Sequence, residues 1–328
     1  MSRVHQLKIS VSGIRGVVGE FLTPNLACNF AQAFGSYVGP GPVVVGRDTR
    51  ASGEMLEHAV TCGLLAAGCE VVKLGVATTP TIQVYVSEIH ARGGIAVTAS
   101  HNPPEYQGIK FSTADGAPAL PEITKRIEHG ISEKITTPDA SGGSIIEFDA
   151  KPSYLDDLRK KIRFDVIAAA KGGYAYDALW GTGRGYLDKC LRDHGSEVET
   201  IHDWRDVTFG GRSPEPGEDH LDELRSAVTS KHLTLGIATD GDGDRFGVID
   251  ANGKFITPNQ LVALLTDYLA ESRGWTNGVA RSVATSHLVD RVAKERNIKL
   301  YETPVGFKFI GELINKDEII LGGEESAG

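Results

Sequence analysis

Cysteine is scarce in this chain of 328 residues, and its four copies form no Cys-x-x-Cys pair. The sequence therefore predicts no disulfide framework, and the cysteines are typical of small apolar residues in a reducing compartment. The chain also lacks an apolar run long enough to cross a bilayer, a signal-peptide core near its first residue and any Asn-x-Ser/Thr site. We expect a cytoplasmic protein that does not enter membranes.

Excess positive charge is missing as well. The 34 Lys and Arg residues face 43 Asp and Glu residues, which gives a formal net charge of −9. An acidic chain is poorly suited to nucleic acids or acidic membrane surfaces, so we expect neither as a partner. A local basic pocket could still bind phosphate. The apolar content of 41% is ordinary for a globular protein, and the length suits roughly two to three domains.

Glycine, in contrast, is abundant, with 39 copies in loops that follow apolar segments. The chain repeats one pattern three times: short apolar segments alternate with amphipathic ones, and each unit ends in an apolar segment followed by a polar loop. This alternation predicts α/β domains with parallel strand pairs. We expect three similar α/β/α domains with mixed, largely parallel sheets, over residues 1–145, 146–255 and 256–328.

Three polar loops close these units, at residues 98–103, 240–245 and 322–328. Ligands of open α/β sheets bind outside the carboxyl ends of the strands. Three equivalent loops on three similar domains would therefore face one central cleft.

The second loop alternates Asp240, Asp242 and Asp244 with glycine. Carboxylates this close repel one another unless a cation offsets their charge, and such a site with open positions suits Mg²⁺ and a phosphate ligand. A calcium EF-hand loop would need Gly and Glu where this chain has Arg245 and Ala251, so that reading is discarded. The plainer alternative is a polar turn, since Asp-Gly pairs favour turns.

Ser100 stands where a predicted strand ends and an Asn-Pro turn begins, which would leave its hydroxyl exposed. A serine that only shapes the turn is the plainer reading. No G-x-S-x-G elbow supports acyl transfer, and the glycine spacing at 181–185 does not fit dinucleotide binding. A phosphoserine could instead place its oxygens on a metal held by the aspartates.

These motifs together resemble the α-D-phosphohexomutase family, whose best-known members are phosphoglucomutase and phosphomannomutase. The resemblance runs in the family's order from near residue 9 to the last residue. It rests on the segments 12–16, 46–53, 98–103, 240–245 and 323–328.

The resemblance implies an enzyme, an intramolecular phosphotransferase that interconverts the 1- and 6-phosphates of glucose or mannose through a phosphoserine and a 1,6-bisphosphate. Ser100 would carry the phosphoryl group. Ser100, Asp240, Asp242 and Asp244 would bind one Mg²⁺ per chain, and the metal would neutralise charge on the transferring group. Glucose 1,6-bisphosphate would be the activator that supplies the first phosphate.

Further roles follow from positions that match family motifs. His101, Lys110 and Arg15 would complete the catalytic set, although His101 could equally orient its loop. Hexose phosphates would be bound by Arg245, Gly306, Phe307, Lys308, Glu324 and Ser326. The plainer alternatives are an arginine that balances the aspartates and a glycine-rich turn near the last residue.

Two features depart from the family pattern. Gln107 replaces the usual Asn of the segment before Lys110. The chain stops at Gly328 inside the loop that matches the sugar loop, so we expect the third domain to be incomplete, the family's fourth domain to be absent and turnover to be impaired.

Two alternative functions remain. Phosphoglucosamine mutase ranks second, because that subgroup usually has Ala in the metal loop and Gln in the sugar loop, where this chain has Gly243 and Glu325. The other alternative is a non-catalytic sugar-phosphate-binding fragment.

Overall fold

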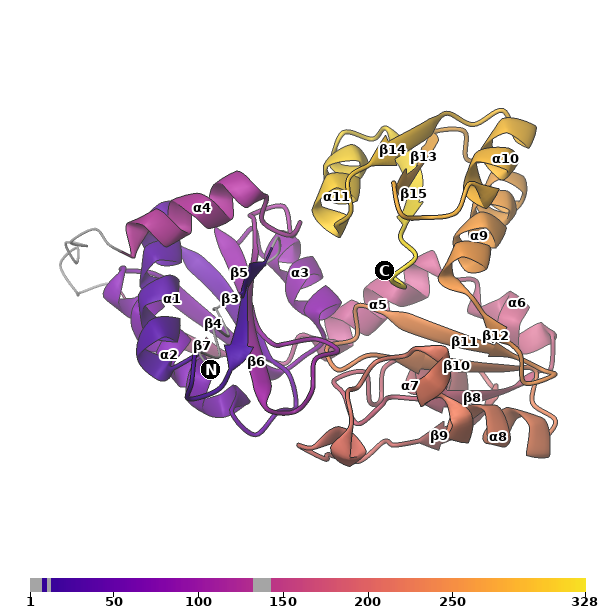
Figure 1. The fold of residues 1–328 in the computed structure, drawn as a ribbon, viewed down its shortest axis with the longest axis horizontal. Helices are drawn as coiled ribbons and strands as arrows, with labels where there is room; N and C mark the ends of the chain where they lie inside the picture. Colours follow the sequence, from indigo (N-terminus) through magenta and orange to yellow (C-terminus); the bar gives the residue numbers. More distant parts are fainter. Residues whose placement is uncertain (1–7, 11–12, 132–142) are drawn as a thin grey trace, which may run out of the picture.

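The computed structural model describes residues 8–10, 13–131 and 143–328, and these form three sheets with helices against them (Figure 1). The sheets have seven, five and three strands in chain order. The first two mix parallel and antiparallel pairs, whereas the third is parallel throughout. The expected fold class, three α/β/α domains with largely parallel sheets, is confirmed, and the third sheet is the smallest.

The elements of the first domain are β1 (Lys8–Ser10), β2 (Gly13–Val17), α1 (Pro24–Val38), β3 (Pro42–Arg47), α2 (Gly53–Ala66), β4 (Glu70–Val76), α3 (Thr79–Glu88), β5 (Gly93–Val97), β6 (Tyr106–Ser112), α4 (Pro121–Gly130) and β7 (Ile145–Glu147). The strand order is β1-β2-β6-β5-β3-β4-β7. The strands β3, β4, β5 and β7 are parallel, and β6, β2 and β1 extend one edge in antiparallel pairs. The sequence pattern predicted the parallel centre and missed this antiparallel edge.

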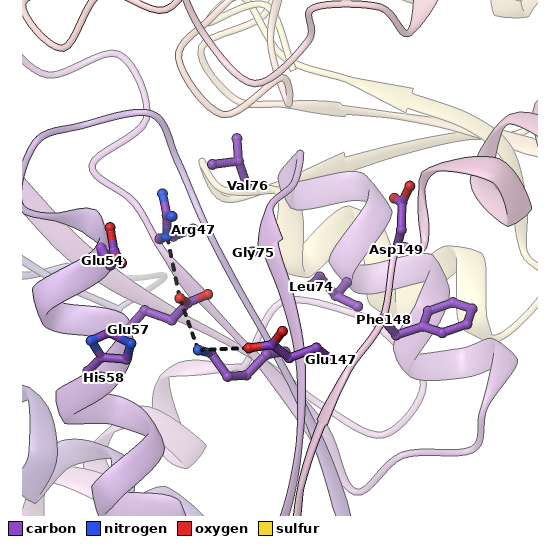
Figure 2. Close-up of a pocket in the computed structure, with 11 residues that line it drawn as sticks. Arg47, Glu54, Glu57, His58, Leu74, Gly75, Val76, Glu147, Phe148 and Asp149 are labelled. Atoms are coloured by element: carbon purple, nitrogen blue, oxygen red, sulfur yellow. Dashed lines mark ion pairs between the residues drawn. The ribbon is translucent and has the colours of Figure 1, made fainter.

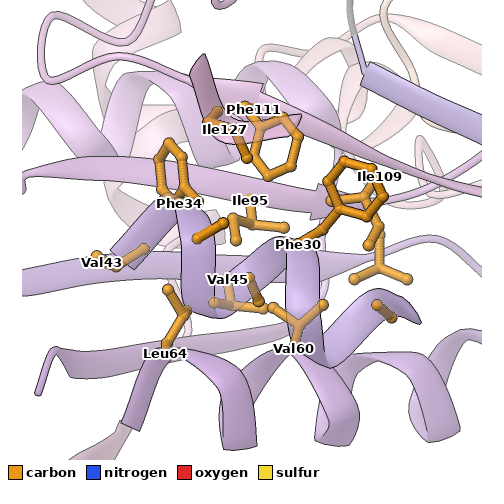
Figure 3. Close-up of a cluster of buried hydrophobic side chains, with 14 of the residues drawn as sticks. Phe30, Phe34, Val43, Val45, Val60, Leu64, Ile95, Ile109, Phe111 and Ile127 are labelled. Atoms are coloured by element: carbon orange, nitrogen blue, oxygen red, sulfur yellow. The ribbon is translucent and has the colours of Figure 1, made fainter. Parts of the chain in front are cut away.

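Both faces of the first sheet are covered, which explains the continuous apolar run of β3. Val43 and Val45 face a core under α1, α2 and α4, in which Phe34 stacks on Phe111 with ring centroids 5.1 Å apart (Figure 3). Val44, between them, faces a second core under α3. Successive side chains of a strand point to opposite faces, so a strand between two helical layers is apolar at every position.

The elements of the second domain are α5 (Lys151–Lys161), α6 (Phe164–Ala169), β8 (Gly173–Asp177), α7 (Leu187–Asp193), β9 (Glu197–Ile201), the 3₁₀ turns η2 (Phe209–Gly211) and η3 (Glu218–His220), α8 (Asp222–Ser230), β10 (Leu235–Thr239), β11 (Phe246–Asp250) and β12 (Phe255–Ile256). The strand order is β12-β11-β10-β8-β9. β8 is parallel to β9 and β10, and β11 returns antiparallel to β10. The aspartate loop is therefore the short connection between β10 and β11.

The elements of the third domain are α9 (Pro258–Arg273), β13 (Gly278–Ser282), α10 (Leu288–Glu295), β14 (Leu300–Thr303), α11 (Phe307–Asn315) and β15 (Ile319–Gly323). β13 lies between β14 and β15. A capping box starts α9: the Thr257 hydroxyl accepts from the Gln260 N–H while the Gln260 side chain accepts from the Thr257 N–H. This reciprocal pair satisfies two donors that the first helical turn leaves free.

Strand pairing extends the first two sheets slightly past the domain boundaries expected from the sequence. β7 (Ile145–Glu147) pairs with the first sheet, and β12 (Phe255–Ile256) pairs with the second. We propose boundaries just after these two strands. No helix among the described residues is long and apolar enough to cross a membrane.

Candidate active site

Loops from all three domains line one cleft of about 570 Å³. Ser100 follows β5, Asp244 and Arg245 follow β10, and Glu324 and Ser326 follow β15. Each of these strands has a parallel neighbour, and each loop leaves its carboxyl end. The structure thus brings together the three loops that the repeat pattern singled out.

The Ser100 hydroxyl links the first two domains directly, because its Oγ donates to Asp240 Oδ2 at 2.6 Å. Ser100 is only 1% exposed, so the expectation of an exposed hydroxyl is wrong. The second domain covers the serine, because its aspartate loop packs directly against the Ser100 loop. The carbonyl of Ser100 lies 2.6 Å from the position that a Cβ would take on Gly241, so only glycine fits at that contact.

The three aspartates bring one carboxylate oxygen each within 4.8 Å of the others. Lys110 Nζ donates to Asp242 Oδ2 and to Asp244 Oδ2, at 2.6 Å in each case. Thr79 Oγ1 donates to Asp242 Oδ2 at 2.5 Å, and the N–H of Asp244 donates to Asp240 Oδ1 at 3.0 Å. The loop therefore draws its partners from β6 and α3 of the first domain as well as from itself.

The donor set fits a small divalent cation. The Oδ1 atoms of Asp242 and Asp244 are buried and have no hydrogen-bond partner among the described residues. Buried carboxylate oxygens without partners are costly, and oxygen ligands of this kind are the ones that Mg²⁺ prefers. Lys110 already contacts two of the three carboxylates, so its ammonium and a bound cation would share them.

The pKa values of the aspartates reflect the electrostatic repulsion within this cluster. Burial and the neighbouring Asp242 and Asp244 carboxylates raise the pKa of Asp240 well above its ordinary value. Burial and Asp242 also raise the pKa of Asp244. For Asp242 burial acts in the same direction, but Lys110 and the hydrogen bond from Thr79 outweigh it and lower its pKa. One ammonium group therefore does not neutralise the whole triad.

His101 and Arg15 lie beside the serine loop. His101 Nδ1 is 3.4 Å from Ser100 Oγ. Burial, together with the positive charges of Arg245 and Arg15, lowers the pKa of His101 to about 3, so its ring is neutral at pH 7. Arg15 Nη1 donates to Asn102 Oδ1 at 3.0 Å, and Arg15 and Arg245 both line the cleft. Two guanidinium groups thus line the cleft beside the serine, where they would attract an anionic ligand.

The two glutamates of the third loop have different surroundings. Glu324 is 3% exposed, lines the cleft and accepts from the Gly306 N–H at 2.5 Å. Burial raises the pKa of Glu324. Glu325 instead accepts from Ser282 Oγ at 3.1 Å and from Thr285 Oγ1 at 3.2 Å, both on or after β13. Its carboxylate therefore forms hydrogen bonds within the third domain and does not line the cleft.

Most of the residues singled out from the sequence meet in this cleft. Its lining includes Arg15, Ser100, Lys110, Asp244, Arg245, Gly306, Phe307, Lys308, Glu324 and Ser326. Asp240 and Asp242 are buried and accept hydrogen bonds from Ser100 and Lys110, respectively, and His101 Nδ1 lies 3.4 Å from Ser100 Oγ. Sequence reasoning missed Thr79. Thr79 lies just after β4, at the same carboxyl edge of the first sheet as Ser100. Its position after a parallel strand could have identified it as a candidate site residue.

A second pocket, of about 640 Å³, lies in the first domain between α2, β4 and the segment after β7 (Figure 2). Its polar groups are largely paired with one another: Glu57 meets Arg47 at 3.4 Å and Lys73 at 3.7 Å, and Lys73 meets Glu147 at 4.0 Å. None of the residues predicted from the motifs for catalysis or binding lines it. This pocket is larger than the cleft between the domains, but it is not the candidate active site.

Comparison with known proteins agrees with the cleft. Residues 6–137, 152–253 and 257–328 match domains I, II and III of "Phosphoglucomutase/phosphomannomutase, alpha/beta/alpha". The chain belongs to the phosphoglucomutase/phosphomannomutase family. This confirms the resemblance to the α-D-phosphohexomutases that the motifs indicated, and with it the expectation of an intramolecular phosphotransferase.

The relatives of this chain include proteins named as phosphoglucosamine mutases and proteins named as phosphoglucomutase/phosphomannomutase. A "Probable phosphoglucosamine mutase" of Methanopyrus kandleri is 36% identical over 95% of this chain and 69% of its own length. A "Phosphoglucomutase/phosphomannomutase" of Thermococcus kodakarensis is 34% identical over 96% of this chain and 71% of its own. The crystal structure of a phosphoglucomutase/phosphomannomutase family protein from Burkholderia thailandensis superposes with a TM-score of 0.87 at 27% identity, covering 97% of this chain and 70% of that one.

We predict that the chain binds one Mg²⁺ and that Asp242→Ala abolishes this binding. The substitution removes a carboxylate with an unpartnered buried oxygen from the triad. Isothermal titration calorimetry measures the binding, and Asp219→Ala, which removes an exposed carboxylate far from the loop in sequence, is the control. Mg²⁺ should also raise the melting temperature of the wild type and of the control, because it binds the folded state selectively. Equal Mg²⁺ affinity in Asp242→Ala and wild type would contradict the site.

Proposed function

We propose that Ser100 carries the phosphoryl group of a phosphohexomutase and that the three aspartates hold one Mg²⁺ against it. The observation that carries this proposal is the 2.6 Å hydrogen bond from Ser100 Oγ to Asp240, which joins two domains at the edge of the cleft. A serine that only shaped its own turn would need no carboxylate from another domain. Bound Mg²⁺ would supply positive charge against the oxygens of the transferring group.

The proposed reaction proceeds in two transfers. A hydroxyl of the hexose phosphate attacks the phosphorus of phospho-Ser100: the new P–O bond forms, the bond to Oγ breaks, and the proton of the hydroxyl replaces the phosphoryl group on Oγ. The product is a hexose 1,6-bisphosphate. After it turns over in the cleft, its other phosphoryl group returns to Ser100 by the reverse exchange. Glucose 1,6-bisphosphate, the proposed activator, would charge the free serine in the same way.

The neighbouring groups divide into a charged and a neutral set. Burial alone would lower the pKa of Lys110, but Asp242 and Asp244 outweigh burial and raise that pKa. Lys110 therefore stays protonated and acts as a hydrogen-bond donor rather than as a base. We assign it to charge stabilisation near the transferring group. With a pKa of about 3, His101 is a weak base at neutral pH. We therefore assign His101 to orienting the Ser100 hydroxyl.

For the sugar, we propose glucosamine phosphate as the preferred substrate, with glucose and mannose phosphates as the alternatives. Relatives of this chain at 34–36% identity include several named as phosphoglucosamine mutases. One relative at 34% has the broader name phosphoglucomutase/phosphomannomutase. This order reverses the ranking drawn from the sequence motifs alone.

Two features of the structure explain why the motif ranking carried little weight. Glu325, one of its two criteria, faces Ser282 and Thr285 rather than the cleft, so it does not read the sugar directly. Gly243, the other, has φ +72°, and a Cβ there would lie 3.0 Å from Thr78 Cγ2. The positive φ and the close approach of Thr78 account for a glycine at this position, so Gly243 does not serve to distinguish substrates.

We predict that Ser100 accepts phosphate from glucose 1,6-bisphosphate in the presence of Mg²⁺, because the serine, the aspartate loop and two arginines, Arg15 and Arg245, meet at the cleft. Tandem mass spectrometry locates the modified residue. Ser100→Ala is the control and should gain no phosphate. Phosphate that appears only on other hydroxyls, or that persists in Ser100→Ala, would show that another residue is the acceptor.

We further predict that glucosamine 1-phosphate discharges phospho-Ser100 faster than glucose 1-phosphate or mannose 1-phosphate. Single-turnover loss of the phosphate, followed by intact mass, measures the three rates. Glu325→Gln should keep their order because its side chain lies outside the cleft, whereas Glu324→Gln should slow discharge by all three sugars. A faster reaction with glucose or mannose phosphate would restore the original ranking, and a change of order in Glu325→Gln would contradict the placement of that residue.

A further inference from the structure

Arg50 is a fully buried arginine whose guanidinium group is devoted to the loop that carries Ser100. Its Nη2 donates to the carbonyls of Ser100 at 2.8 Å and Asn102 at 2.6 Å. Its Nη1 donates to the carbonyls of Pro103 at 2.5 Å and Tyr106 at 3.3 Å. Four carbonyls of one short loop thus converge on a single planar group, a geometry that arginine can satisfy and lysine cannot.

Asp48 completes the network from the other side of the loop. Asp48 Oδ2 accepts from Arg50 Nε at 2.9 Å and from Thr98 Oγ1 at 2.9 Å, and its Oδ1 accepts from Gln107 Nε2 at 3.1 Å. Thr98 Oγ1 in turn accepts from the Ser100 N–H at 2.9 Å. The backbone of Ser100 is therefore held at its N–H through Thr98 and at its carbonyl by Arg50.

This double hold matters because Ser100 has a φ of +52°. A residue with a Cβ adopts this left-handed conformation only where its surroundings impose it. Released from the network, the backbone of Ser100 would relax to negative φ and carry its Oγ away from Asp240 Oδ2. The 2.6 Å contact between the serine and the aspartate loop thus depends on contacts made by groups that do not line the cleft.

The second domain seals the arginine. The ring of Phe209 lies over the guanidinium group, with the Arg50 carbon Cζ 4.8 Å from its centroid, and Phe209 is fully buried. Beside it, Thr49 Oγ1 donates to the carbonyl of Trp180 at 3.1 Å. The domain that provides the aspartate loop therefore also closes over the group that orients the serine. A buried guanidinium is stable only when its donors are satisfied, and here every one of its nitrogens has a partner.

From these contacts we infer that Arg50 is a positioning residue for phosphoryl transfer: together with Asp48 it holds Ser100 in the conformation that faces the aspartate loop. This role rests on the phosphoserine function proposed above. It differs from a contribution to folding alone, because it predicts a defect in the transfer step that exceeds any loss of stability.

Arg50→Met tests the inference, since methionine fills part of the volume and provides no donors. Arg47→Met is the matched control: it removes another arginine of the same segment, one whose ion pair with Glu57 lies in the separate pocket of Figure 2. We expect phosphorylation of Ser100 at saturating glucose 1,6-bisphosphate to slow by about a hundredfold in Arg50→Met, because misplaced reacting groups can cost that much. The KM for the donor should stay unchanged, and Arg47→Met should react at the wild-type rate.

Further measurements separate positioning from loss of structure. Thermal unfolding and Mg²⁺ calorimetry should show Arg50→Met folded and able to bind the metal, because the aspartate loop makes no contact with the arginine in the hydrogen-bond network described above. Arg50→Lys keeps the positive charge without the planar fork of donors, and it serves as the second variant if methionine prevents folding. It should also slow phosphorylation, by about tenfold or more.

The outcomes are distinct. Wild-type rates in a folded Arg50→Met, or in Arg50→Lys where methionine does not fold, would overturn the positioning role and leave the proposed function standing. A defect that appears only as a raised KM would also overturn it, since positioning acts on the transfer step. A wild type that takes no phosphate at Ser100 would overturn the proposed function itself, and the role of Arg50 with it.

Discussion

The repulsion among three closely spaced carboxylates, two of them buried and one half-buried, is the constraint on which the rest of the site depends. Asp240, Asp242 and Asp244 lie in one loop of the second domain, and burial makes their mutual repulsion expensive. Part of the compensation comes from the first domain, through the ammonium of Lys110 and the hydroxyl of Ser100. The aspartate loop therefore gains these partners only when the two domains meet, and that meeting brings the Ser100 hydroxyl against Asp240.

The topology of the first sheet makes this meeting possible. Ser100 follows the parallel strand β5, at the carboxyl edge of the parallel strands. The cationic residues Lys110 and Arg15 come instead from the antiparallel strands β6 and β2. β6 pairs antiparallel with β5 so that Lys110 lies opposite Ala96, and β2 pairs with β6 so that Arg15 lies opposite Gly108. The antiparallel strands of the first sheet thus bring Lys110 and Arg15 to the cleft, and the second domain supplies the aspartates that face them.

The sequence predicted that three aspartates would cluster, because they are close together in the chain and alternate positions in one loop need no tertiary information. The alternation of segments likewise predicted the parallel strands and their helices. Contacts between distant segments were beyond such patterns. Thr79 bonds to Asp242 across 163 positions, and Arg50 gathers carbonyls from a loop some 50 positions away. The burial of Ser100 was mispredicted for the same reason, since its cover comes from another domain.

The most direct test of the account asks whether the phosphoserine and the aspartate loop form one centre. Mn²⁺ can take the place of Mg²⁺ among oxygen ligands, and its unpaired electrons broaden the ³¹P resonance of any phosphate held beside it. In the phosphorylated chain, a saturating amount of Mn²⁺ should broaden the phospho-Ser100 signal beyond detection, and Asp242→Ala should restore a sharp line at the same concentration. A phosphoserine signal that stays sharp in the wild type while Mn²⁺ is bound would show that metal and phosphate occupy separate places, and would contradict the account.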